Sequence, residues 1–589
     1  MAPRAAFLSA LFLLGCFPPG EGLDPPLSKV YFPVGLAVDE KQKFLFVVNS
    51  DFDLQYNAGS VQSWDLGQLR ARVPHYCESD ADCADRTVAV DENGERTLDR
   101  RAQCHPEARW CVLPGDSPCG LFREQDDREK ALYPGRCGPI SPIIPQDGGP
   151  PILPLESNLE NVVQGRAVVI GAFASDVVRR TLVTPPGSSG DVAEGRERLF
   201  IPVRGDATLH WIDVNSDGTL YCGQNGDDRL CDDDHRAGDD PEQENTRNNM
   251  RMEPEPFGLD ADENGLNVVV SNQTSGAVSL FSHLREPEAI AWAKGPQFVW
   301  REGGMPQRPI GVANVPMPLA RPSSGREHLP GFLVSFRNAH TVFMVRVYDD
   351  AASAPSRPFL RRYEAERIQT NSSGIDSRGI GVDPFNRHAA ENDCLARFGI
   401  ERECALDPNC AGAQDSAFQA CLTSAAATPL DVFIANRAPS SLVLGRTKPI
   451  TSDSATTDIP SFYGTLPLDV GPSRVYVGDI INLEGERERR IFVLCFDSRR
   501  IAIYDPIRRE LETEIVTGRG PHGFAIDTKL VDDDPNDAIV GPNDEHAYAY
   551  IGHFLDSYVG VVDLDQRHKN LYGKIIANVG KPQPPRASK

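Results

Sequence analysis

The sequence predicts an all-β fold, a seven-bladed β-propeller with disulfide-rich loop insertions, and three observations support this prediction. Short apolar runs rich in β-branched and aromatic residues recur along the 589 residues. Each run is followed, after a polar turn of hairpin length, by a second apolar run, which is typical of antiparallel strands. A Gly-containing segment precedes most of these pairs. Three or four antiparallel strands repeated seven times predict a ring of radial sheets.

The innermost strand of each sheet is predicted from the Gly-containing segment, because glycine in a strand suits a place where two backbones approach closely. Five copies are clear: PVGLAVD (33–39), PFGLDAD (256–262), PIGVANV (309–315), RGIGVDP (378–384) and PHGFAID (521–527). The second and sixth copies are degraded, and we expect them near GAFASDV (171–177) and PLDVGPS (467–473).

The second strands are nearly continuous in apolar character, as strands covered on both faces require. They are FLFVVN (44–49), RLFIPV (198–203), NVVVSN (267–272), GFLVSF (331–336), DVFIAN (431–436), RIFVLCF (490–496) and AYAYIGH (547–553). The third strands are GSVQSWDL (59–66), ATLHWIDV (207–214), GAVSLFSH (276–283), HTVFMVRVYD (340–349), SSLVLGRT (440–447), RRIAIYDP (499–506) and SYVGVVDL (557–564). Fourth strands follow in several copies, for example ELETEIV (510–516) and YGKIIANVG (572–580).

The order P-x-G-φ-x-x-D, φφVxN and G-x-V-x-φ-x-D-L, where φ is apolar, resembles the YVTN/NHL class of propeller repeats over residues 27–580. The resemblance implies the architecture and leaves the activity open, because such repeats occur in lectins, signalling scaffolds, lactonases and dehydrogenase subunits. A pair of β-sandwiches would give fewer and less periodic strand triplets, and a β-helix would give shorter repeats. Six or eight blades are the alternatives to seven.

The first residues read as a targeting segment. A positive charge precedes the apolar stretch Ala5–Leu14, which is shorter than the about 20 residues needed to cross a bilayer. The sequence Leu13-Leu14-Gly15-Cys16 resembles the lipobox of bacterial lipoproteins, although Leu14 departs from the usual small or β-branched residue. An ordinary signal peptide is the alternative. We expect an exported protein of the cell envelope, either an outer-membrane lipoprotein or periplasmic, that contacts the membrane only through a lipid on Cys16.

The expected domain organisation follows from these patterns. Residues 1–16 form the signal peptide, 17–26 a tether, 27–580 the β-propeller and 581–589 a C-terminal tail. Two Cys-rich insertions, 67–160 and 385–428, interrupt the propeller, and the second contains two short helices.

The cysteines support export, because every cluster holds an even number, as disulfides in an oxidising compartment require. Zinc would need close Cys/His pairs, which are missing. Cys495 is left over in a buried strand. The clusters are Cys77, Cys83, Cys104, Cys111, Cys119 and Cys137; Cys222 and Cys231; and Cys394, Cys404, Cys410 and Cys421.

Polar residues in the turns between second and third strands are predicted to surround one end of the central funnel, which we call the mouth. Loops on a rigid scaffold commonly carry function, and arginine suits carboxylate or phosphate. The alternative is that these turns are simply solvated. The ligand-binding candidates in these turns are Asn49, Asp51, Asp53, Arg337, His340, Arg437, Arg499 and His553, and His522 joins them because it precedes an innermost strand and should lie near the axis at the same mouth. Arg204, Asp206, Asn272, Asn436, Asp497 and Asp556 occupy equivalent turns.

Calcium is the one cofactor that the sequence offers, through Asp213, Asn215 and Asp217. These oxygen donors alternate before a glycine, as at the start of an EF-hand loop. The twelfth position is Gln224 where the motif has a bidentate Glu, so a solvated acidic loop is the alternative.

The net charge and the missing catalytic motifs limit the possible functions. The net charge of −24 lacks the basic face that a nucleic-acid partner requires. The motifs G-x-S-x-G, H-E-x-x-H, P-loop and C-x-x-C-H are missing. We therefore expect a binding or scaffold module for a protein or polar ligand, more plausibly not an enzyme. The alternatives are a metal-assisted hydrolase or lactonase with its site in the funnel, and a subunit of a larger assembly.

Overall fold

A computed structural model defines the fold for most of the chain. It describes residues 23–83, 88–90, 96–98, 101–119, 123–144, 149–156, 162–185, 188–224, 229–247, 249–287, 289–320, 329–349, 355–368, 375–406, 410–452, 455–530 and 545–582. The predicted signal peptide with Cys16, most of the tether and nearly all of the tail lie outside these residues. None of the described helices has the length and apolar character needed to cross a membrane.

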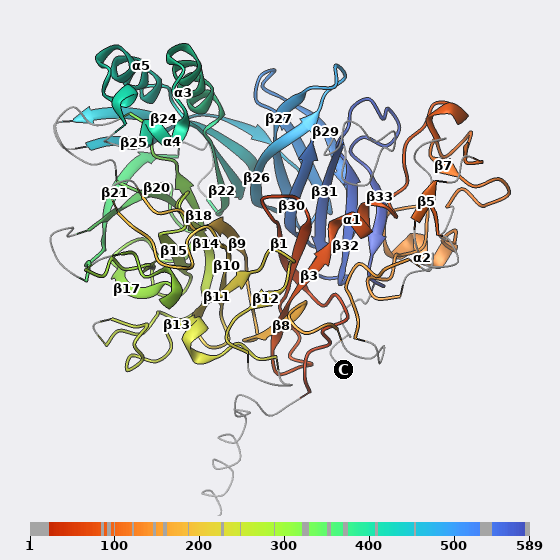
Figure 1. The fold of residues 1–589 in the computed structure, drawn as a ribbon, viewed down its shortest axis with the longest axis horizontal. Helices are drawn as coiled ribbons and strands as arrows, with labels where there is room; N and C mark the ends of the chain where they lie inside the picture. The colour runs from red at the N-terminus through yellow and green to blue at the C-terminus, as the bar shows by residue number, and fades with distance from the viewer. Residues whose placement is uncertain are drawn as a thin grey trace, which may run out of the picture.

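Seven sheets of four or five described strands are arranged around a common centre, which confirms the seven-bladed propeller (Figure 1). The strands of each sheet follow one another in the chain, except in the first sheet, where an insertion separates the third strand from the fourth. The first four sheets are β1 (Pro33–Val38), β2 (Phe44–Asn49), β3 (Gly59–Asp65) and β8 (Ala167–Ile170); β9 (Val178–Thr181), β10 (Glu197–Val203), β11 (Thr208–Val214), β12 (Leu220–Tyr221) and β13 (Arg236–Ala237); β14 (Pro256–Ala261), β15 (Asn267–Asn272), β16 (Ala277–Ser282) and β17 (Gln297–Glu302); and β18 (Pro309–Val315), β19 (Gly331–Phe336), β20 (Thr341–Tyr348) and β21 (Phe359–Arg367).

The remaining three sheets complete the ring and close it on the first. They are β22 (Ser377–Asp383), β23 (Asp431–Arg437), β24 (Ser440–Ser452) and β25 (Ala455–Pro467); β26 (Pro472–Ile481), β27 (Arg487–Cys495), β28 (Arg500–Asp505) and β29 (Glu510–Val516); and β30 (Pro521–Lys529), β31 (His546–His553), β32 (Tyr558–Asp563) and β33 (Ile575–Val579). The first strand of each sheet lies nearest the centre in Figure 1, and β1 packs beside β30.

Glycines of the innermost strands lie where neighbouring sheets crowd together. A Cβ on Gly258 would stand 2.0 Å from the Ile310 carbonyl oxygen of the next sheet. A Cβ on Gly379 would stand 2.5 Å from the Arg474 Cα, again one sheet further on. These distances are below any real Cβ contact, so only glycine permits this spacing of the sheets. The predicted reason for the P-x-G repeat is therefore confirmed.

Side chains hold the last sheet against the first. Arg70 of helix α1 (Leu66–Arg70) binds Asp527 of β30 with Nη2 2.7 Å from Oδ2, and both side chains are buried. Asp527 also accepts hydrogen bonds from His546 at 3.0 Å and Tyr550 at 2.7 Å. We call this group the Arg70–Asp527 latch. It satisfies a carboxylate that would otherwise be expensive to bury.

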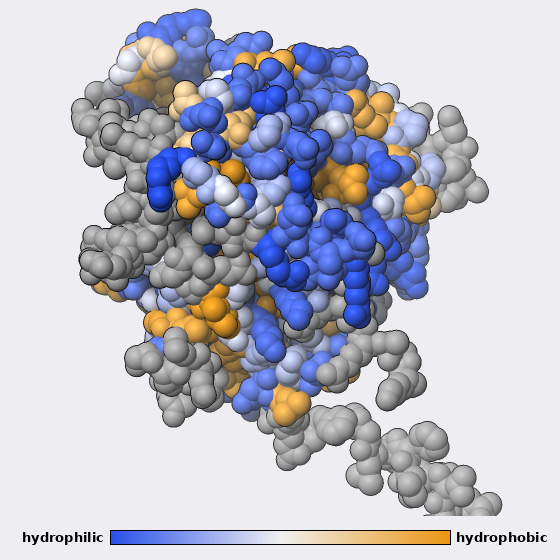
Figure 2. Space-filling view, turned by 90° about the vertical axis from the view of Figure 1, so that its right-hand side faces the viewer, coloured by the Kyte–Doolittle hydropathy of each residue, from blue (hydrophilic) through white to orange (hydrophobic). Residues whose placement is uncertain are grey.

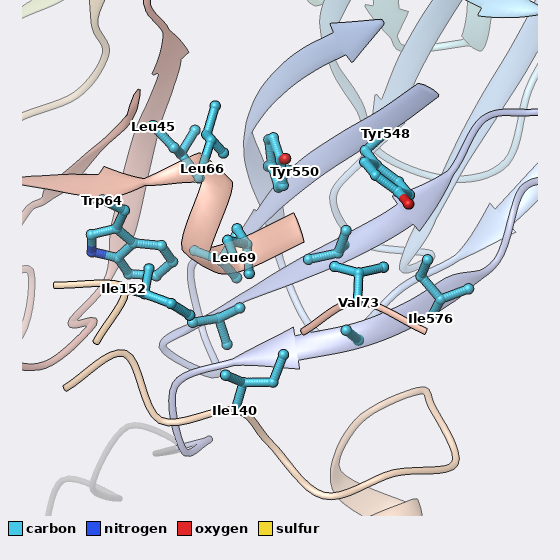
Figure 3. Close-up of a cluster of buried hydrophobic side chains, with 14 of the residues drawn as sticks. Leu45, Trp64, Leu66, Leu69, Val73, Ile140, Ile152, Tyr548, Tyr550 and Ile576 are labelled. Atoms are coloured by element: carbon cyan, nitrogen blue, oxygen red, sulfur yellow. The ribbon is translucent and has the colours of Figure 1, made fainter. Parts of the chain in front are cut away.

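The first Cys-rich insertion runs between β3 and β8 and lies against the first and seventh sheets. It carries α2 (Asp127–Leu132) and the short hairpins β4 (Val88–Val90) with β5 (Arg96–Leu98) and β6 (Gln103–Cys104) with β7 (Cys111–Val112). Ile140 and Ile152 of the insertion pack in one cluster with Trp64, Leu69 and Ile576 (Figure 3).

The insertion also covers the outer edge of the seventh sheet. The Ile140 N–H donates to the Asn578 carbonyl at 2.7 Å, and the Gly580 N–H donates back to Ile140 at 2.9 Å. Pairing of this kind removes an open strand edge that would invite association with other chains.

The side of the molecule drawn at the right of Figure 1 is mostly hydrophilic, with small and separate hydrophobic patches (Figure 2).

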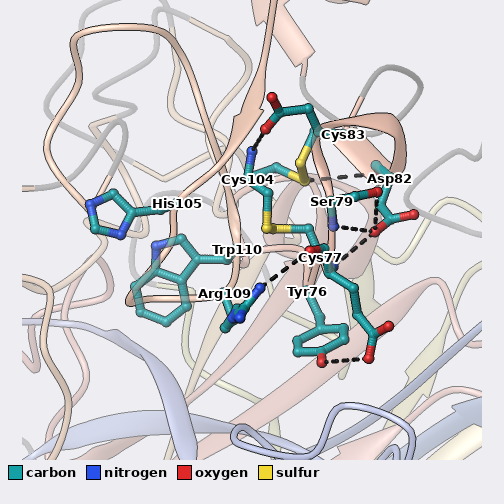
Figure 4. The surroundings of a disulfide bond; sticks show 12 residues. Tyr76, Cys77, Ser79, Asp82, Cys83, Cys104, His105, Arg109 and Trp110 are labelled. Carbon is teal, nitrogen blue, oxygen red and sulfur yellow. Dashed lines mark hydrogen bonds between the residues drawn. A yellow bond between two sulfur atoms is a disulfide. The ribbon is translucent and has the colours of Figure 1, made fainter.

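Every predicted cysteine cluster pairs within itself. Figure 4 shows Cys77 bonded to Cys104 next to Cys83, in a turn where Asp82 accepts a hydrogen bond from the Ser79 N–H at 2.8 Å. Cys495 is buried and free. The disulfides of the described residues are Cys77–Cys104, Cys83–Cys111, Cys119–Cys137, Cys222–Cys231, Cys394–Cys421 and Cys404–Cys410.

The second insertion is helical. Helices α3 (Phe385–Phe398) and α5 (Ser416–Ala426) are joined by the Cys394–Cys421 disulfide, and α4 (Arg402–Leu406) lies between them. Arg387 of α3 is buried against Asp458 of β25, with Nη2 2.7 Å from Oδ1. These contacts fix the helices on the outer part of the fifth sheet, at the upper left of Figure 1.

Two of the predicted innermost strands are misplaced. The second sheet begins with β9 at Val178, directly after the predicted 171–177, and the sixth begins with β26 at Pro472, at the end of the predicted 467–473. β26 extends to Ile481 and β27 begins at Arg487, so a short connection separates them. Gly478 interrupts the apolar pattern of β26 where the seventh sheet approaches closely, since a Cβ there would stand 2.1 Å from the Ile526 Cδ1.

Candidate functional site

The mouth contains the turns between second and third strands and the connections between sheets, because antiparallel strands bring both to the same end of the disc. Three arginines gather there with two carboxylates. The Arg378 Nε lies 2.6 Å from Asp376 Oδ1, and the Arg337 Nε lies 3.4 Å from the same oxygen. Arg437, at the end of β23, pairs with Asp497. We call Arg337, Arg378 and Arg437 the arginine half of the mouth.

This arrangement leaves positive charge unbalanced. Burial lowers the pKa of Arg378, and although Asp376 opposes this, the charges of Arg337 and Arg437 lower it further. The charges of Arg337 and Arg437 therefore act on Arg378, and among the described residues Asp376 and Asp497 are the carboxylates that pair with the three guanidinium groups. Arg337 and Arg437 are about one-third exposed, at 32% and 33%, so their heads reach solvent. The cluster suits an anionic group, because arginine donates in a fork that matches carboxylate or phosphate.

A cavity of about 310 Å³ continues from Arg337 between the third and fourth sheets. Its polar lining suits a hydrated or polar ligand. The residues around it are Glu255, Gln273, Thr274, Gln307, Arg308 and Arg337.

An ion pair closes the funnel below the mouth. Arg474 of the sixth sheet reaches Asp176, which precedes the second sheet, with Nη1 2.5 Å from Oδ2. Its other terminal nitrogen donates to the Ser175 carbonyl at 2.8 Å. The side chains are 13% and 16% exposed. Burial alone would lower the pKa of Arg474, but the charges of Asp176 and Tyr476 and the hydrogen bonds to them together outweigh it and raise the pKa. Arg474 therefore stays charged and forms the floor of the funnel.

The opposite side of the mouth is aromatic. The Phe52 ring centroid lies 5.2 Å from that of Phe554 and 5.9 Å from that of Phe173. Phe554 contacts Phe496 at 6.3 Å and lies above the buried Phe32 at 5.0 Å. We call Phe52, Phe173, Phe496 and Phe554 the aromatic half of the mouth. Edge-to-face contacts of this kind are favourable and hold the rings in place.

His522 lies beside the aromatic half, at the inner end of β30. Its ring centroid is 5.8 Å from that of Phe554, and its Nδ1 is 2.8 Å from the Val34 carbonyl oxygen. A carbonyl can only accept, so Nδ1 carries the proton and Nε2 has a lone pair. Burial and the nearby charge of Arg474 lower the pKa of His522 to about 3. The imidazole is therefore neutral at physiological pH.

Three of the predicted mouth residues, Arg337, Arg437 and His522, take part in these groups. Arg499 and His340 lie in mouth turns outside the two halves, and Asp53 accepts a hydrogen bond from Tyr31 at 2.5 Å.

The structure places the other predicted residues inside the protein. Asn49 accepts from the Tyr31 N–H at 2.9 Å and donates to Ser60 at 3.2 Å, so it fixes the end of β2. His553 is buried and stacks on Tyr558, with ring centroids 4.1 Å apart. Asp51 is buried in the β2–β3 turn, where burial raises its pKa to about 7.

Asp376, Arg378, Asp176 and Arg474 belong to the site but were not predicted. They lie just before or at the start of innermost strands. The available signal was that connections between sheets lie at the same end of the disc as the turns between second and third strands. Only His522 was predicted from it.

The predicted calcium ligands do not converge. Both oxygens of Asp213 bind Arg198, at 2.6 and 3.1 Å, within the second sheet. Asn215 and Asp217 each bind Thr219, at 2.9 and 2.7 Å between side chains, and so close an exposed turn. Calcium at this loop stays a prediction.

Comparisons with known proteins find only distant similarities to solved structures. No protein-family model and no curated protein sequence matches the chain. Among solved structures, it is similar to the hydrazine synthase of Kuenenia stuttgartiensis (10% identity, 93% of this chain and 100% of that one, TM-score 0.38). It is also similar to the periplasmic gluconolactonase of Pseudomonas aeruginosa (10%, 83% and 86%, 0.36) and to AztD of Citrobacter koseri (13%, 66% and 83%, 0.30). Such low identities and TM-scores carry no argument about fold or activity.

Proposed function

We propose that this protein is a binding module whose mouth holds an anionic ligand through Arg337, Arg378 and Arg437. The observation that carries the proposal is the gathering of three guanidinium groups against two carboxylates, with two of the three heads partly exposed. A protein with 84 acidic and 60 basic residues has little reason to concentrate arginines in one place unless they meet negative charge. Carboxylate and phosphate are the groups that arginine forks recognise.

The test is calorimetric titration of the intact protein with acetate, citrate and inorganic phosphate at low and high salt. We expect Arg437→Gln and Arg337→Gln to weaken binding of the best anion at least tenfold, because each removes a charged donor. Arg508→Gln is the matched control, since Arg508 is an exposed arginine in the β28–β29 turn at the opposite end of the disc. Thermal midpoints confirm that the variants are folded. Equal anion binding by all four proteins would refute the proposal.

We also propose that the chain is exported and anchored by a lipid on Cys16, with residues 17–26 as the tether. The sequence Leu13-Leu14-Gly15-Cys16 and the pairing of all twelve cysteines of the described clusters support this, because such pairs persist in oxidising compartments. Metabolic labelling with a fatty acid should mark the protein, and Cys16→Ser should abolish the label and release the protein from membranes. Label on the Cys16→Ser variant would contradict the anchor.

A hydrolase acting in the funnel is the second candidate, and His522 favours it. Its Nε2 lone pair lies near the charged Arg474, a pairing that could take a proton from water and stabilise a developing oxyanion. A base with a pKa of about 3 is weak, however, which ranks this function below ligand binding. Proton release from a δ-lactone, lost in His522→Gln, would support it. Rates equal to those of buffer would exclude a δ-lactone substrate.

A further inference from the structure

We propose that the ligand of the mouth is an amphipathic anion, with its charged head on the arginine half and its apolar body on the aromatic half. This inference rests on the proposed function and extends it by naming the ligand class. The class is a monoanionic carboxylate that carries an alkyl chain or an aromatic ring system.

The first observation is exposed apolar surface in a turn. Phe52 is 47% exposed and Leu54 is 64% exposed, and both belong to the β2–β3 turn at the mouth. Turns of a soluble propeller are ordinarily polar, and single exposed apolar residues are common. Here, however, the exposed Phe52 and Leu54 lie two residues apart in one turn, and Phe52 packs on the half-buried Phe173 and the buried Phe554, so the apolar surface is more than an isolated residue.

The second observation is that this surface is supported from below. Phe32 is 2% exposed, and its ring lies 6.2 Å from Phe52 and 5.0 Å from Phe554 between centroids. The Phe32 N–H donates to the Ser557 hydroxyl at 3.2 Å, so the support spans the junction of the first and seventh sheets. A preformed surface loses little entropy when it binds, which is how a small apolar area becomes useful in recognition.

The third observation is that the two halves meet. Phe496 and Asp497 are neighbours in the β27–β28 turn; Phe496 contacts Phe554, and Asp497 pairs with Arg437. A ligand whose head binds at Arg437 would therefore meet the aromatic half at the half-buried Phe496, which contacts the buried Phe554. Ligand sites commonly combine a largely apolar lining with a few charged groups that fix orientation.

These contacts discriminate between ligand classes. A sugar phosphate or citrate could use the arginines, but it would leave Phe52 and Leu54 exposed. An uncharged hydrocarbon could cover the rings, but it would leave the guanidinium charges unbalanced. A ligand with one anionic head and an apolar body satisfies both halves at once.

The test compares three probes on the intact protein by calorimetry: decanoate, acetate and decanol. We expect decanoate to bind at least tenfold more tightly than acetate, because burial of about two methylene groups already accounts for a tenfold change. Decanol should bind more weakly than decanoate. Phosphatidylglycerol vesicles form a separate arm, since a lipid surface offers the same chemistry; binding to vesicles without binding to decanoate would overturn the free ligand.

Variants separate this inference from the proposed function. Phe52→Ser should weaken decanoate binding at least fivefold and leave acetate binding unchanged, whereas Arg437→Gln should weaken both. The control is Ile507→Ser, because Ile507 is 71% exposed but lies in the β28–β29 turn at the opposite end of the disc. Equal affinity for decanoate and acetate, with Arg437→Gln still damaging, would overturn only the amphipathic ligand. Equal binding of decanol and decanoate, with Arg437→Gln harmless, would overturn the proposed function itself.

Discussion

The propeller sheets and the two Cys-rich insertions are ordered by different means. All six residues of β15 are buried, and the same holds for β2 and β19. In its described residues, the first insertion has short helices and hairpins, and three disulfides cross it. A sheet thus gains its order from apolar burial, whereas an insertion gains it from covalent links and from docking onto finished sheets.

The difference teaches where the molecule is vulnerable. Damage within the helical insertion should stay local, because its buried apolar residues cluster apart from the sheet strands. Damage at a contact that joins an insertion to a sheet should spread, because it loosens the closure of the ring as well. The following changes test this comparison, from the largest expected effect to the smallest.

Loss of the Arg70–Asp527 latch should have the largest effect. Asp527→Ala would leave the buried Arg70 without its partner, at a cost of about 3–5 kcal/mol in the free energy of unfolding. Guanidinium unfolding followed by circular dichroism measures it. Asp393→Ala is the control, since its pair with Arg397 on α3 is exposed at both ends and should cost less than about 1 kcal/mol. Equal destabilisation by the two changes would contradict the latch.

The latch also has a defined pH dependence. Burial would raise the pKa of Asp527, but Arg70 and His546 outweigh it and lower the pKa. A lowered carboxyl pKa contributes stability that is present above the unfolded value and is lost as pH falls through the folded one. The difference in stability between the protein and Asp527→Ala should therefore shrink in acid, below about pH 4.

Removal of one disulfide from the helical insertion should have a smaller and local effect. In the double variant Cys394→Ala and Cys421→Ala, the insertion should lose about 2–4 kcal/mol of local stability, because its unfolded loop is no longer constrained. Hydrogen exchange should speed up in α3 and α5 while β15 and β19 stay protected. Cys495→Ala controls for loss of a buried sulfur outside the insertions. Faster exchange throughout the sheets would show that the insertion supports the ring.

Docking of the first insertion should weaken as pH rises. His568 of the seventh sheet stacks on Tyr76 of the insertion, with ring centroids 4.8 Å apart, and binds Asp563 at 2.7 Å. Burial lowers the pKa of His568, but the hydrogen bond and charge of Asp563 and the charge of Asp565 outweigh it, so the net shift is upward. A raised imidazole pKa contributes stability that is complete below the unfolded value of 6.5 and is lost as pH rises through the folded one.

Limited proteolysis of the insertion between pH 5.5 and 8.5 measures this effect. Cleavage should accelerate about fivefold on the alkaline side, equivalent to about 1 kcal/mol, and His568→Gln should remove the pH dependence. An unchanged pH profile in His568→Gln would assign the effect to another group.

The smallest effect is expected from the surface pair between the same two regions. Lys569 lies 3.0 Å from Glu78, with side chains 72% and 62% exposed. Such pairs are screened by salt and contribute little. Glu78→Gln should leave both the unfolding midpoint and the proteolysis rate unchanged. A clear loss of docking would mean that exposed charge matters more here than the buried stack.

The sheets were predictable because their signal is repeated. FLFVVN became β2 with the predicted bounds, since a run covered on both faces is apolar throughout. The innermost strands β9 and β26 were misplaced because they pack by close backbone approach, as at Gly379, and so need few apolar side chains. Their pattern is therefore weak wherever the P-x-G repeat is lost.

The mouth was only partly predictable. Position after a second strand identified Arg337 and Arg437, but the same position holds Asn49 and His553, which point inward to complete the turn. The ion pair that forms the floor of the funnel could not be predicted. Arg474 and Asp176 are 298 residues apart in the chain and meet only when the ring is closed. The aromatic half was missed because phenylalanines in turns carry no periodic signal.

The position of the latch bears on the order in which the molecule can be made. Arg70 is synthesised 457 residues before Asp527. The first sheet therefore lacks its contact with the seventh sheet during most of synthesis. Each later sheet can pack against the one before it as the chain emerges. The ring stays open, with one uncovered face on the first sheet and one on the newest sheet, until the seventh sheet has been synthesised. A chaperone that binds the nascent chain should therefore be needed longest at residues 33–70.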